Sequence, residues 1–294
     1  MTNFDFQIIL AGFLVALPCA LLGSFLVLRK MVMMGDAISH AVLPGIVIAF
    51  FLSGERNSGT MLLGACVMGL FSTFLIEYLH KKAGLQADAS IGVTFTAFFA
   101  IGIILISLFA GQVDLDQDCV LYGEIAYVPL DVWITDGGTN LGPRIVWNMA
   151  IVSVLVIGFV VLFYKELKIN TFDPAFAAVA GISAVVWHYA LMGMVTVVTI
   201  TAFEAVGAIL VIAFLAGPPA TAFLITTKLK SMLMLSVLLG FSAILLGYAL
   251  ALSTQGSVAG AISVAIGFQF VVVVVIQQIN KRRAIVVQGK PLSA

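Results

Sequence analysis

The chain has 294 residues, of which 62% are hydrophobic and only 10% are charged. Soluble domains carry about 25% charged and about 45–50% apolar residues, so this composition excludes a soluble globular protein. It indicates a chain that shelters most of its apolar side chains in a lipid bilayer. The formal net charge of zero gives no indication of nucleic-acid binding.

Nine apolar segments follow one another along the chain, and each is near the ~20 residues that a helix needs to cross a bilayer. None alternates as a membrane β-strand would. The sequence therefore predicts an all-α polytopic membrane protein, with one transmembrane domain over residues 1–294. Eight crossings are the alternative to nine, because 181–226 contains several helix-breaking residues. The nine segments are 6–28, 32–52, 59–79, 90–109, 145–163, 181–201, 205–226, 231–253 and 257–277.

The basic residues indicate how these crossings are oriented. With nine crossings, twelve of the fourteen lysines and arginines fall on one side, and only Arg56 and Arg144 fall on the other. Because loops rich in lysine and arginine stay in the cytoplasm, the side with twelve is predicted to be cytoplasmic. The N-terminus is then outside, and the C-terminal tail, about 279–294, is inside.

Two connections are long. The outer loop, about 110–143, is acidic and includes Asp118. The inner loop, about 165–180, contains Asp173 followed by Pro174, a helix start signal with aspartate as the N-cap and proline in the first turn. This signal predicts a short helix on the cytoplasmic membrane surface, and the alternative is an ordinary turn into the next crossing.

Two ionisable residues, Asp36 and His40, lie inside the second apolar segment. An aspartate at membrane depth costs about 2.5–3.5 kcal/mol on insertion scales, and such residues usually face a cavity or a pathway. The spacing of four residues puts both side chains on one helix face. A rise of ~1.5 Å per residue places Asp36 about 7 Å and His40 about 13 Å from the cytoplasmic boundary.

The pair is a candidate metal site, because carboxylate oxygen suits manganese and imidazole nitrogen suits zinc, iron or manganese. One aspartate and one histidine are too few ligands for a full shell. A second copy of the pair across a dimer axis would raise the number to four. Two other interpretations of Asp36 and His40 stay open, namely a hydrogen bond that ties helices together and a proton relay.

A second intramembrane acid, Glu204, lies where the sixth and seventh segments meet, towards the predicted outer side. It is a candidate for the outer mouth of a pathway or for a helix cap. In the seventh segment, Gly217, Pro218 and Pro219 are predicted to break the helix or to kink it strongly. Proline lacks the backbone donor and clashes with the preceding turn.

Several catalytic motifs are absent from the sequence. It contains no GxxxxGK[ST], HExxH or GxSxG, so it is not predicted to be a P-loop ATPase, a zincin or a hydrolase. Of the three histidines, His80 beside Lys81 is predicted to be interfacial. His188 is predicted to be a hydrogen-bonded packing residue, with a functional role as the alternative.

Four stretches resemble the bacterial ABC permeases for manganese, zinc and iron, the metal-chelate family. They occur in the family's order and cover most of the chain. The forms DQDCVLYGE and FEAVGAILV are more similar to the manganese/iron branch than to the zinc branch. The four stretches are LVLRKMVMMGDAISHAVLPGIVIAF, LDQDCVLYGEIAYVPLD, LKINTFDPAFAAVAG and FEAVGAILVIAFLAGPPATAFLIT.

The resemblance implies a multi-pass permease of the bacterial cytoplasmic membrane that is not itself an enzyme. It implies a homo- or heterodimer with two cytoplasmic ATPase subunits, and an extracytoplasmic binding protein that delivers Mn, Zn or Fe. The metal is cargo, and no cofactor is permanently bound. Family members commonly have about eight helices, which keeps that alternative open.

The resemblance also implies roles for particular residues. Asp36 and His40 match the family's metal-coordinating positions. The segment Phe172, Asp173 and Pro174 matches the coupling helix seated on the ATPase. The outer loop with Asp118 is a candidate docking surface or gate, and Glu204 is a candidate pathway residue.

Two other functions stay open on the sequence. A proton- or sodium-coupled secondary transporter would use Asp36, His40 and Glu204 as a relay, although no inverted repeat is apparent. A membrane-embedded enzyme would use the Asp36–His40 pair to hold a catalytic metal, although no recognised catalytic motif supports it.

Overall fold

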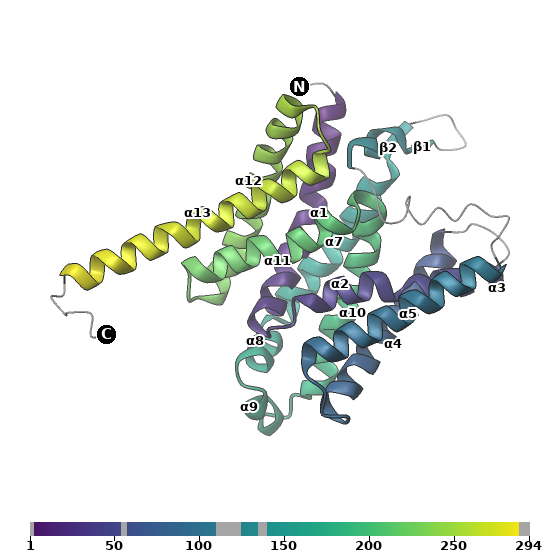
Figure 1. The fold of residues 1–294 in the computed structure, drawn as a ribbon, viewed down its shortest axis with the longest axis horizontal. Helices are drawn as coiled ribbons and strands as arrows, with labels where there is room; N and C mark the ends of the chain where they lie inside the picture. The colour runs from purple at the N-terminus through teal and green to yellow at the C-terminus, as the bar shows by residue number, and fades with distance from the viewer. Residues whose placement is uncertain (1–2, 54–57, 110–124, 135–139, 288–294) are drawn as a thin grey trace.

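The computed structural model describes residues 3–53, 58–109, 125–134 and 140–287, and these ranges are almost entirely helical (Figure 1). Helices suit a bilayer because each backbone N–H and C=O is bonded within its own segment. The elements in chain order are α1 (Asn3–Leu28), α2 (Met33–Ala41), α3 (Leu43–Ser53), α4 (Ser58–Lys81), α5 (Ala87–Phe109), the 3-10 helix η1 (Ile125–Leu130), β1 (Val132–Ile134), β2 (Asn140–Pro143), α7 (Arg144–Leu162), α8 (Tyr164–Phe172), α9 (Pro174–Val179), α10 (Ala184–Val206), α11 (Ala208–Ile225), α12 (Leu229–Thr254) and α13 (Val258–Val287).

Nine stretches of the described chain are long and apolar enough to cross a membrane, which confirms the prediction of nine crossings over eight. Eight of these spans are single helices, and the second, Met33–Ser53, consists of α2 and α3. The interruption falls at Val42, just before Pro44. Proline has no N–H to donate to the carbonyl of His40, so the helical bonding is weakened at this point.

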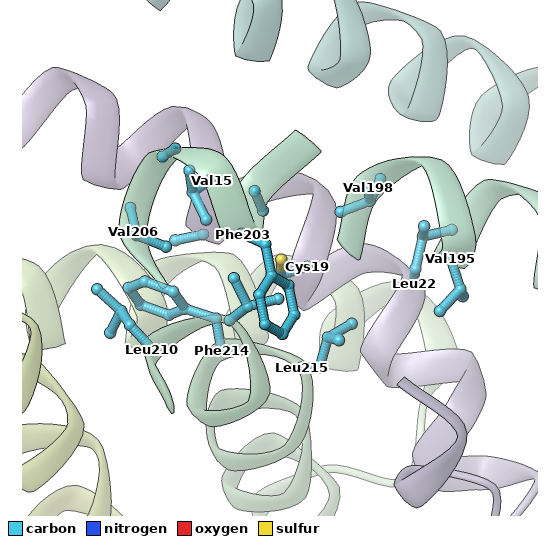
Figure 2. Packing of buried hydrophobic residues seen from close by; sticks show 14 of the residues in the cluster. Val15, Cys19, Leu22, Val195, Val198, Phe203, Val206, Leu210, Phe214 and Leu215 are labelled. Atoms are coloured by element: carbon cyan, nitrogen blue, oxygen red, sulfur yellow. The ribbon is translucent and has the colours of Figure 1, made fainter. Parts of the chain in front are cut away.

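The packed core lies where α1, α10 and α11 meet. α1 is the most enclosed of the nine spans, because 67% of its most apolar stretch is buried inside the protein. Figure 2 shows Cys19 of α1 beside Phe203 of α10, Leu22 of α1 beside Val195 of α10, and Leu210 beside Phe214 within α11. Lipid tails are as apolar as these side chains, so close packing, rather than escape from water, holds such helices together.

Two groups of helices flank this core. On one side α2, α3, α4 and α5 pack against one another, and on the other side α12 and α13 pack against each other and against α11 (Figure 1). A buried hydrogen bond of 3.1 Å between the hydroxyls of Ser24 and Ser236 joins α1 to α12. The Ser153 hydroxyl of α7 donates to the Leu14 carbonyl of α1 over 2.8 Å. Polar side chains therefore reinforce the packing around α1.

The predicted helix break at Gly217, Pro218 and Pro219 is wrong, because α11 is a continuous helix through these residues, and the alternative of a strong kink stays a prediction. Pro219 cannot donate to the carbonyl of Leu215. That carbonyl lies instead against Gly23 of α1, where a β-carbon would come within 2.2 Å of the oxygen. Gly23 thus allows α1 to pack directly against the backbone carbonyl that proline leaves free.

The separation between the sixth and seventh crossings lies at Gly207, between α10 and α11. Its φ of 77° is a conformation that glycine adopts without strain. Glu204 lies in the last turn of α10, three residues before this glycine. Its backbone is therefore at the junction where the sequence placed it, and its role in a pathway stays a prediction.

Part of the predicted outer loop is folded against the helices. Ile125 and Val128 of η1 are buried, and a β-carbon on Gly12 of α1 would lie 3.3 Å from Ile125 Cδ1. β1 and β2 form a short antiparallel hairpin that leads into α7. Asp118 lies outside the described residues, and its role in a gate stays a prediction.

The predicted inner loop is helical. α8 follows α7 after a single intervening residue, and α9 begins at Pro174. The Asp173 carboxylate accepts a 2.9 Å hydrogen bond from the backbone N–H of Phe176, which makes it the N-cap that the sequence predicted. α9 lies at one end of the bundle (Figure 1). Phe172 at the end of α8 and Phe176 of α9 are both exposed.

Candidate functional site

α2 has one buried face and one partly open face. It packs against α4, α5, α10 and α11. Asp36 and His40 lie on the partly open face, because helical geometry turns them away from the buried positions. Apart from Gly35, the buried residues recur at helical spacing and are Met34, Ala37, Ile38 and Ala41.

Asp36 and His40 meet as the spacing predicted. Asp36 Oδ1 and His40 Nε2 are 3.5 Å apart, and the side chains are 37% and 26% exposed. The His40 ring lies beside Phe95 and Phe99 of α5, with centroid distances of 5.9 and 5.6 Å. Aromatic rings thus support one side of the imidazole, while part of the carboxylate and part of the ring remain accessible.

Small residues fix the backbone around this pair. Gly35 lets α2 approach α11, because a β-carbon there would lie 2.8 Å from Leu215 Cδ1. The Ser39 hydroxyl donates to the backbone carbonyl of Asp36. The helix that carries the two side chains is therefore held closely against its neighbour.

The pair is an incomplete ligand set. In the described part of the chain, no group of three or more histidine, cysteine, aspartate or glutamate side chains is placed to hold a metal ion. Asp36 and His40 supply two donors, whereas a site for Mn²⁺ is typically octahedral with about six. Further donors have to come from another chain, from water or from backbone oxygens.

A cavity of about 600 Å³ lies beside the start of α2. It is lined by the link between α1 and α2, the end of α4, the starts of α5 and α10, and α8. Arg29, Lys30 and Lys81 are among its lining residues, which places it at the end of the molecule predicted to be cytoplasmic. Pro174 also lines it, so the predicted coupling segment adjoins this cavity.

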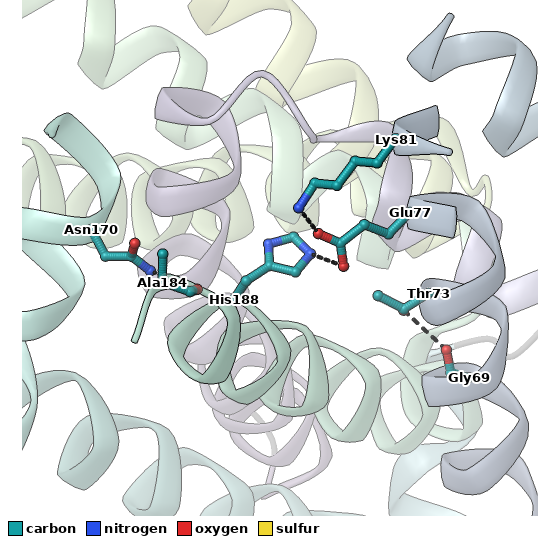
Figure 3. Close-up of polar contacts among 7 residues, drawn as sticks. All are labelled: Gly69, Thr73, Glu77, Lys81, Asn170, Ala184 and His188. Atoms are coloured by element: carbon teal, nitrogen blue, oxygen red, sulfur yellow. Dashed lines mark hydrogen bonds and ion pairs between the residues drawn. The ribbon is translucent and has the colours of Figure 1, made fainter. Parts of the chain in front are cut away.

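Three ionisable side chains form a cluster at this cavity (Figure 3). His188 Nε2 of α10 lies 3.4 Å from Glu77 Oε2 of α4, and Lys81 pairs with the other carboxylate oxygen. The side chains of Glu77 and His188 are only 13% and 14% exposed. The contact brings α4 and α10 together, which agrees with the packing role predicted for His188, but Glu77 Oε2 and His188 Nε2 make no hydrogen bond within the described residues, so the predicted hydrogen bond is not found.

Sequence reasoning missed Glu77. A glutamate four residues before a lysine near a helix end has the ordinary pattern of a solvent-exposed ion pair. The available signal was its position inside the third apolar segment, where an acid needs a partner. That partner, His188, is far away in the sequence.

The sequence is similar to known transport proteins. It matches the ABC 3 transport family over residues 1–278. The manganese transport system membrane protein MntD of Bacillus subtilis is 45% identical over 265 residues, which cover 90% of this chain and 89% of that protein. The zinc transport system membrane protein TroD of Treponema pallidum is 41% identical over 267 residues, or 91% of this chain and 72% of that protein.

Solved structures also resemble this chain. PsaBC from Streptococcus pneumoniae, solved in complex with Fab, matches with a TM-score of 0.75 and 31% identity over 93% of this chain and 91% of that chain. An inward-facing metal-chelate type ABC transporter shares the fold, with a TM-score of 0.62. These similarities confirm the predicted resemblance and do not favour the ion-coupled alternative. The chain belongs to the ABC 3 transport family.

Proposed function

We propose that this chain is the transmembrane permease subunit of an ATP-driven importer of divalent transition metal ions. One observation carries the proposal: Asp36 and His40 share a face of a membrane-spanning helix that the protomer leaves partly uncovered. Ionisable groups at membrane depth belong against a partner or a water-filled pathway. Both groups are also good donors to a divalent transition metal.

Manganese is the first candidate for the cargo, and zinc and iron are the others. MntD, named for manganese transport, is 45% identical to this chain, and TroD, named for zinc transport, is 41% identical. The two donors are compatible with each of these metals, because imidazole binds zinc, iron and manganese. Support for manganese therefore comes from the relatives, and the transition-metal class comes from the donors.

A second permease protomer is proposed to complete the site. Two copies of Asp36 and His40 across a dimer axis give four donors, and water supplies the remaining positions of an octahedral shell. The partner, identical or homologous, also covers the open face of α2. A site shared between protomers is weakened when they move apart, which suits a pathway that has to release its ion.

The energy is assigned to separate cytoplasmic ATPase subunits, because the chain has no P-loop. Phe172, Asp173 and Pro174 are proposed to seat the short helix α9 on the ATPase. An extracytoplasmic binding protein delivers the ion to the outer face, where Glu204 and Asp118 are candidates for the pathway or gate. The permease lies in the bacterial cytoplasmic membrane with its C-terminus inside.

Reconstitution of the permease in liposomes, with its ATPase subunits and binding protein, tests this function. Uptake of Mn²⁺, Zn²⁺ and Fe²⁺ is measured separately, with and without ATP. We expect ATP-dependent uptake of at least one metal, fastest for Mn²⁺, that persists when proton and sodium gradients are collapsed. Uptake that needs a gradient and not ATP would contradict the proposal.

A further inference from the structure

The segment before α9 is attached at two neighbouring residues to two different transmembrane elements. Asn170 of α8 donates through Nδ2 to the Ala184 carbonyl at the start of α10, over 3.3 Å (Figure 3). The next residue, Thr171, accepts a 3.1 Å hydrogen bond from Arg29 Nε at the end of α1. The Thr171 hydroxyl donates in turn to the Leu167 carbonyl over 2.7 Å, so the hydroxyl both donates and accepts.

Arg29 begins the link that joins α1 to α2, and this link is a tight, defined turn. The Lys30 N–H donates to the Val27 carbonyl over 3.1 Å, and the Met31 N–H donates to the Leu26 carbonyl over 2.9 Å. These two bonds form a Schellman cap, in which glycine usually takes the left-handed position. Lys30 occupies that position with φ of 59°, a strained conformation for a residue with a side chain.

The turn leads directly to the donors of the candidate site. α2 begins at Met33, and Asp36 lies in its first turn. A helix that starts from a hydrogen-bonded turn moves with that turn, because packed elements shift as rigid units. A displacement of Arg29 is therefore passed to Asp36 over a short stretch of ordered backbone.

The Arg29 side chain is held inside the protein, where it depends on the acceptors around it. Its Nη2 atom is buried and has no hydrogen-bond partner among the described residues. Burial lowers the pKa of the guanidinium to about 10, so it stays protonated near neutral pH. Arg29 is partly buried, so its guanidinium bears a desolvation penalty when it loses an acceptor, and the bond to Thr171 avoids that penalty.

We propose that Arg29 and Thr171 are positioning residues that pass movement of the α8–α9 segment to α2, and so to the Asp36–His40 pair. Asn170 attaches the same segment to α10 in parallel. The inference rests on the proposed function, because it takes α9 to move with an ATPase and α2 to carry the metal donors. Both residues act through α2 and not on the ion.

Thr171→Val tests the link, because valine keeps the shape of threonine and removes the hydroxyl. In the reconstituted importer, we expect the number of metal ions taken up per ATP hydrolysed to fall about tenfold, the effect of losing a hydrogen bond to a charged group. Co-purification with the ATPase is expected to remain. Thr171→Ser keeps the hydroxyl and is expected to restore the ratio, which a purely structural defect at this position would not predict.

Thr96→Val is the matched control. The Thr96 hydroxyl also donates to the carbonyl four residues earlier, Gly92, over 2.7 Å, but Thr96 is exposed on α5. Its replacement is expected to leave the ratio of ions to ATP unchanged. A Thr171→Val effect that Thr96→Val reproduces would overturn the proposal.

Arg29→Gln removes the other partner and is expected to lower the ratio to the same extent. The double variant is expected to be no worse than either single variant, because each removes the same bond. An unchanged ratio in Arg29→Gln or Thr171→Val, with wild-type uptake normal, overturns this inference alone. Wild-type complexes that hydrolyse ATP and take up no metal overturn the proposed function and this inference with it.

Discussion

The protein contains two carboxylate–imidazole pairs of nearly equal separation in different surroundings. Asp36 and His40 are 3.5 Å apart on one helix, and their side chains are 37% and 26% exposed. Glu77 and His188 are 3.4 Å apart on two helices, and their side chains are 13% and 14% exposed. Lys81 adds a cation to the second pair. We call them the open pair and the closed pair.

The difference shows that the environment of such a pair, rather than its chemistry, decides what it can do. In the closed pair the carboxylate is enclosed between Lys81 of its own helix and an imidazole of a neighbouring helix, so it lies in the contact between α4 and α10. In the open pair both groups are on α2, one face is partly uncovered, and lone pairs remain available. A metal ion can therefore compete for the open pair more easily than for the closed pair.

The largest expected effect is loss of transport when the open pair is changed. Asp36→Asn and His40→Ala each remove a proposed ligand, and we expect ATP-dependent metal uptake to fall by more than about 100-fold. Co-purification with the ATPase is expected to be unchanged, because neither side chain belongs to the α8–α9 segment. Uptake in reconstituted liposomes, measured with each candidate metal, provides the readout.

Glu77→Gln is the matched control for Asp36→Asn, because it makes the same isosteric change in the closed pair. Its uptake is expected to stay within about tenfold of wild type, since the carboxylate is not a proposed ligand. Equal loss of uptake in the two variants would show that the two pairs do not differ in role. Normal uptake in either open-pair variant would remove that residue from the metal site.

The second effect is on stability, and here we expect the change in the closed pair to matter more than the change in the open pair. Glu77→Gln leaves Lys81 and His188 without a carboxylate, and we expect the free energy of unfolding to fall by about 2 kcal/mol. Asp36→Asn is expected to change it by less than about 0.5 kcal/mol, because a partly exposed pair contributes little. Thermal unfolding of the two variants and the wild type in the same detergent measures these losses of stability. A larger loss in Asp36→Asn would contradict the comparison.

Features that depend on neighbouring residues in the chain could be predicted from the sequence. The number of crossings follows from runs of apolar residues, and the start of α9 follows from the Asp173–Pro174 signal. The meeting of Asp36 and His40 follows from their spacing on a helix. Each of these depends on backbone geometry over one or a few turns.

Features that depend on packing between distant segments could not be predicted in this way. Proline chemistry alone favours a break in α11, but the helix continues through Pro218 and Pro219 and packs closely against Gly23 of α1. Glu77 has the sequence pattern of a surface ion pair, and its second partner, His188, comes from α10. Which face of α2 stays open depends on how α5 and α10 pack against it, and no local pattern encodes that.

A smaller effect on stability is expected from a substitution that separates α4 from α10 and leaves Glu77 and His188 themselves unchanged. A β-carbon on Gly69 of α4 would lie 2.5 Å from Thr196 Cγ2 of α10, and threonine is stiff. Gly69→Ala is therefore expected to push the two helices apart and to lower the free energy of unfolding by about 1 kcal/mol. Gly92→Ala on α5 is the control, because a β-carbon there meets nothing within 4 Å. If thermal unfolding showed an equal or greater loss of stability for Gly92→Ala, the close approach of α4 and α10 at Gly69 would not be the cause of the effect.

The smallest effect is expected at His80, an imidazole that lines the same cavity as the closed pair. Its Nδ1 donates to the Leu85 carbonyl over 2.9 Å, but the residue is exposed, so water can replace this bond at little cost. His80→Gln is expected to keep uptake within about twofold of wild type and to change the free energy of unfolding by less than about 0.5 kcal/mol. Uptake and thermal unfolding are compared with His188→Gln, which removes an imidazole that is mostly buried against Glu77. If His80→Gln reduced uptake as much as His40→Ala, an imidazole outside the open pair would belong to the pathway. Exposure at membrane depth would then no longer explain why the open pair, and not the closed pair, takes part in transport.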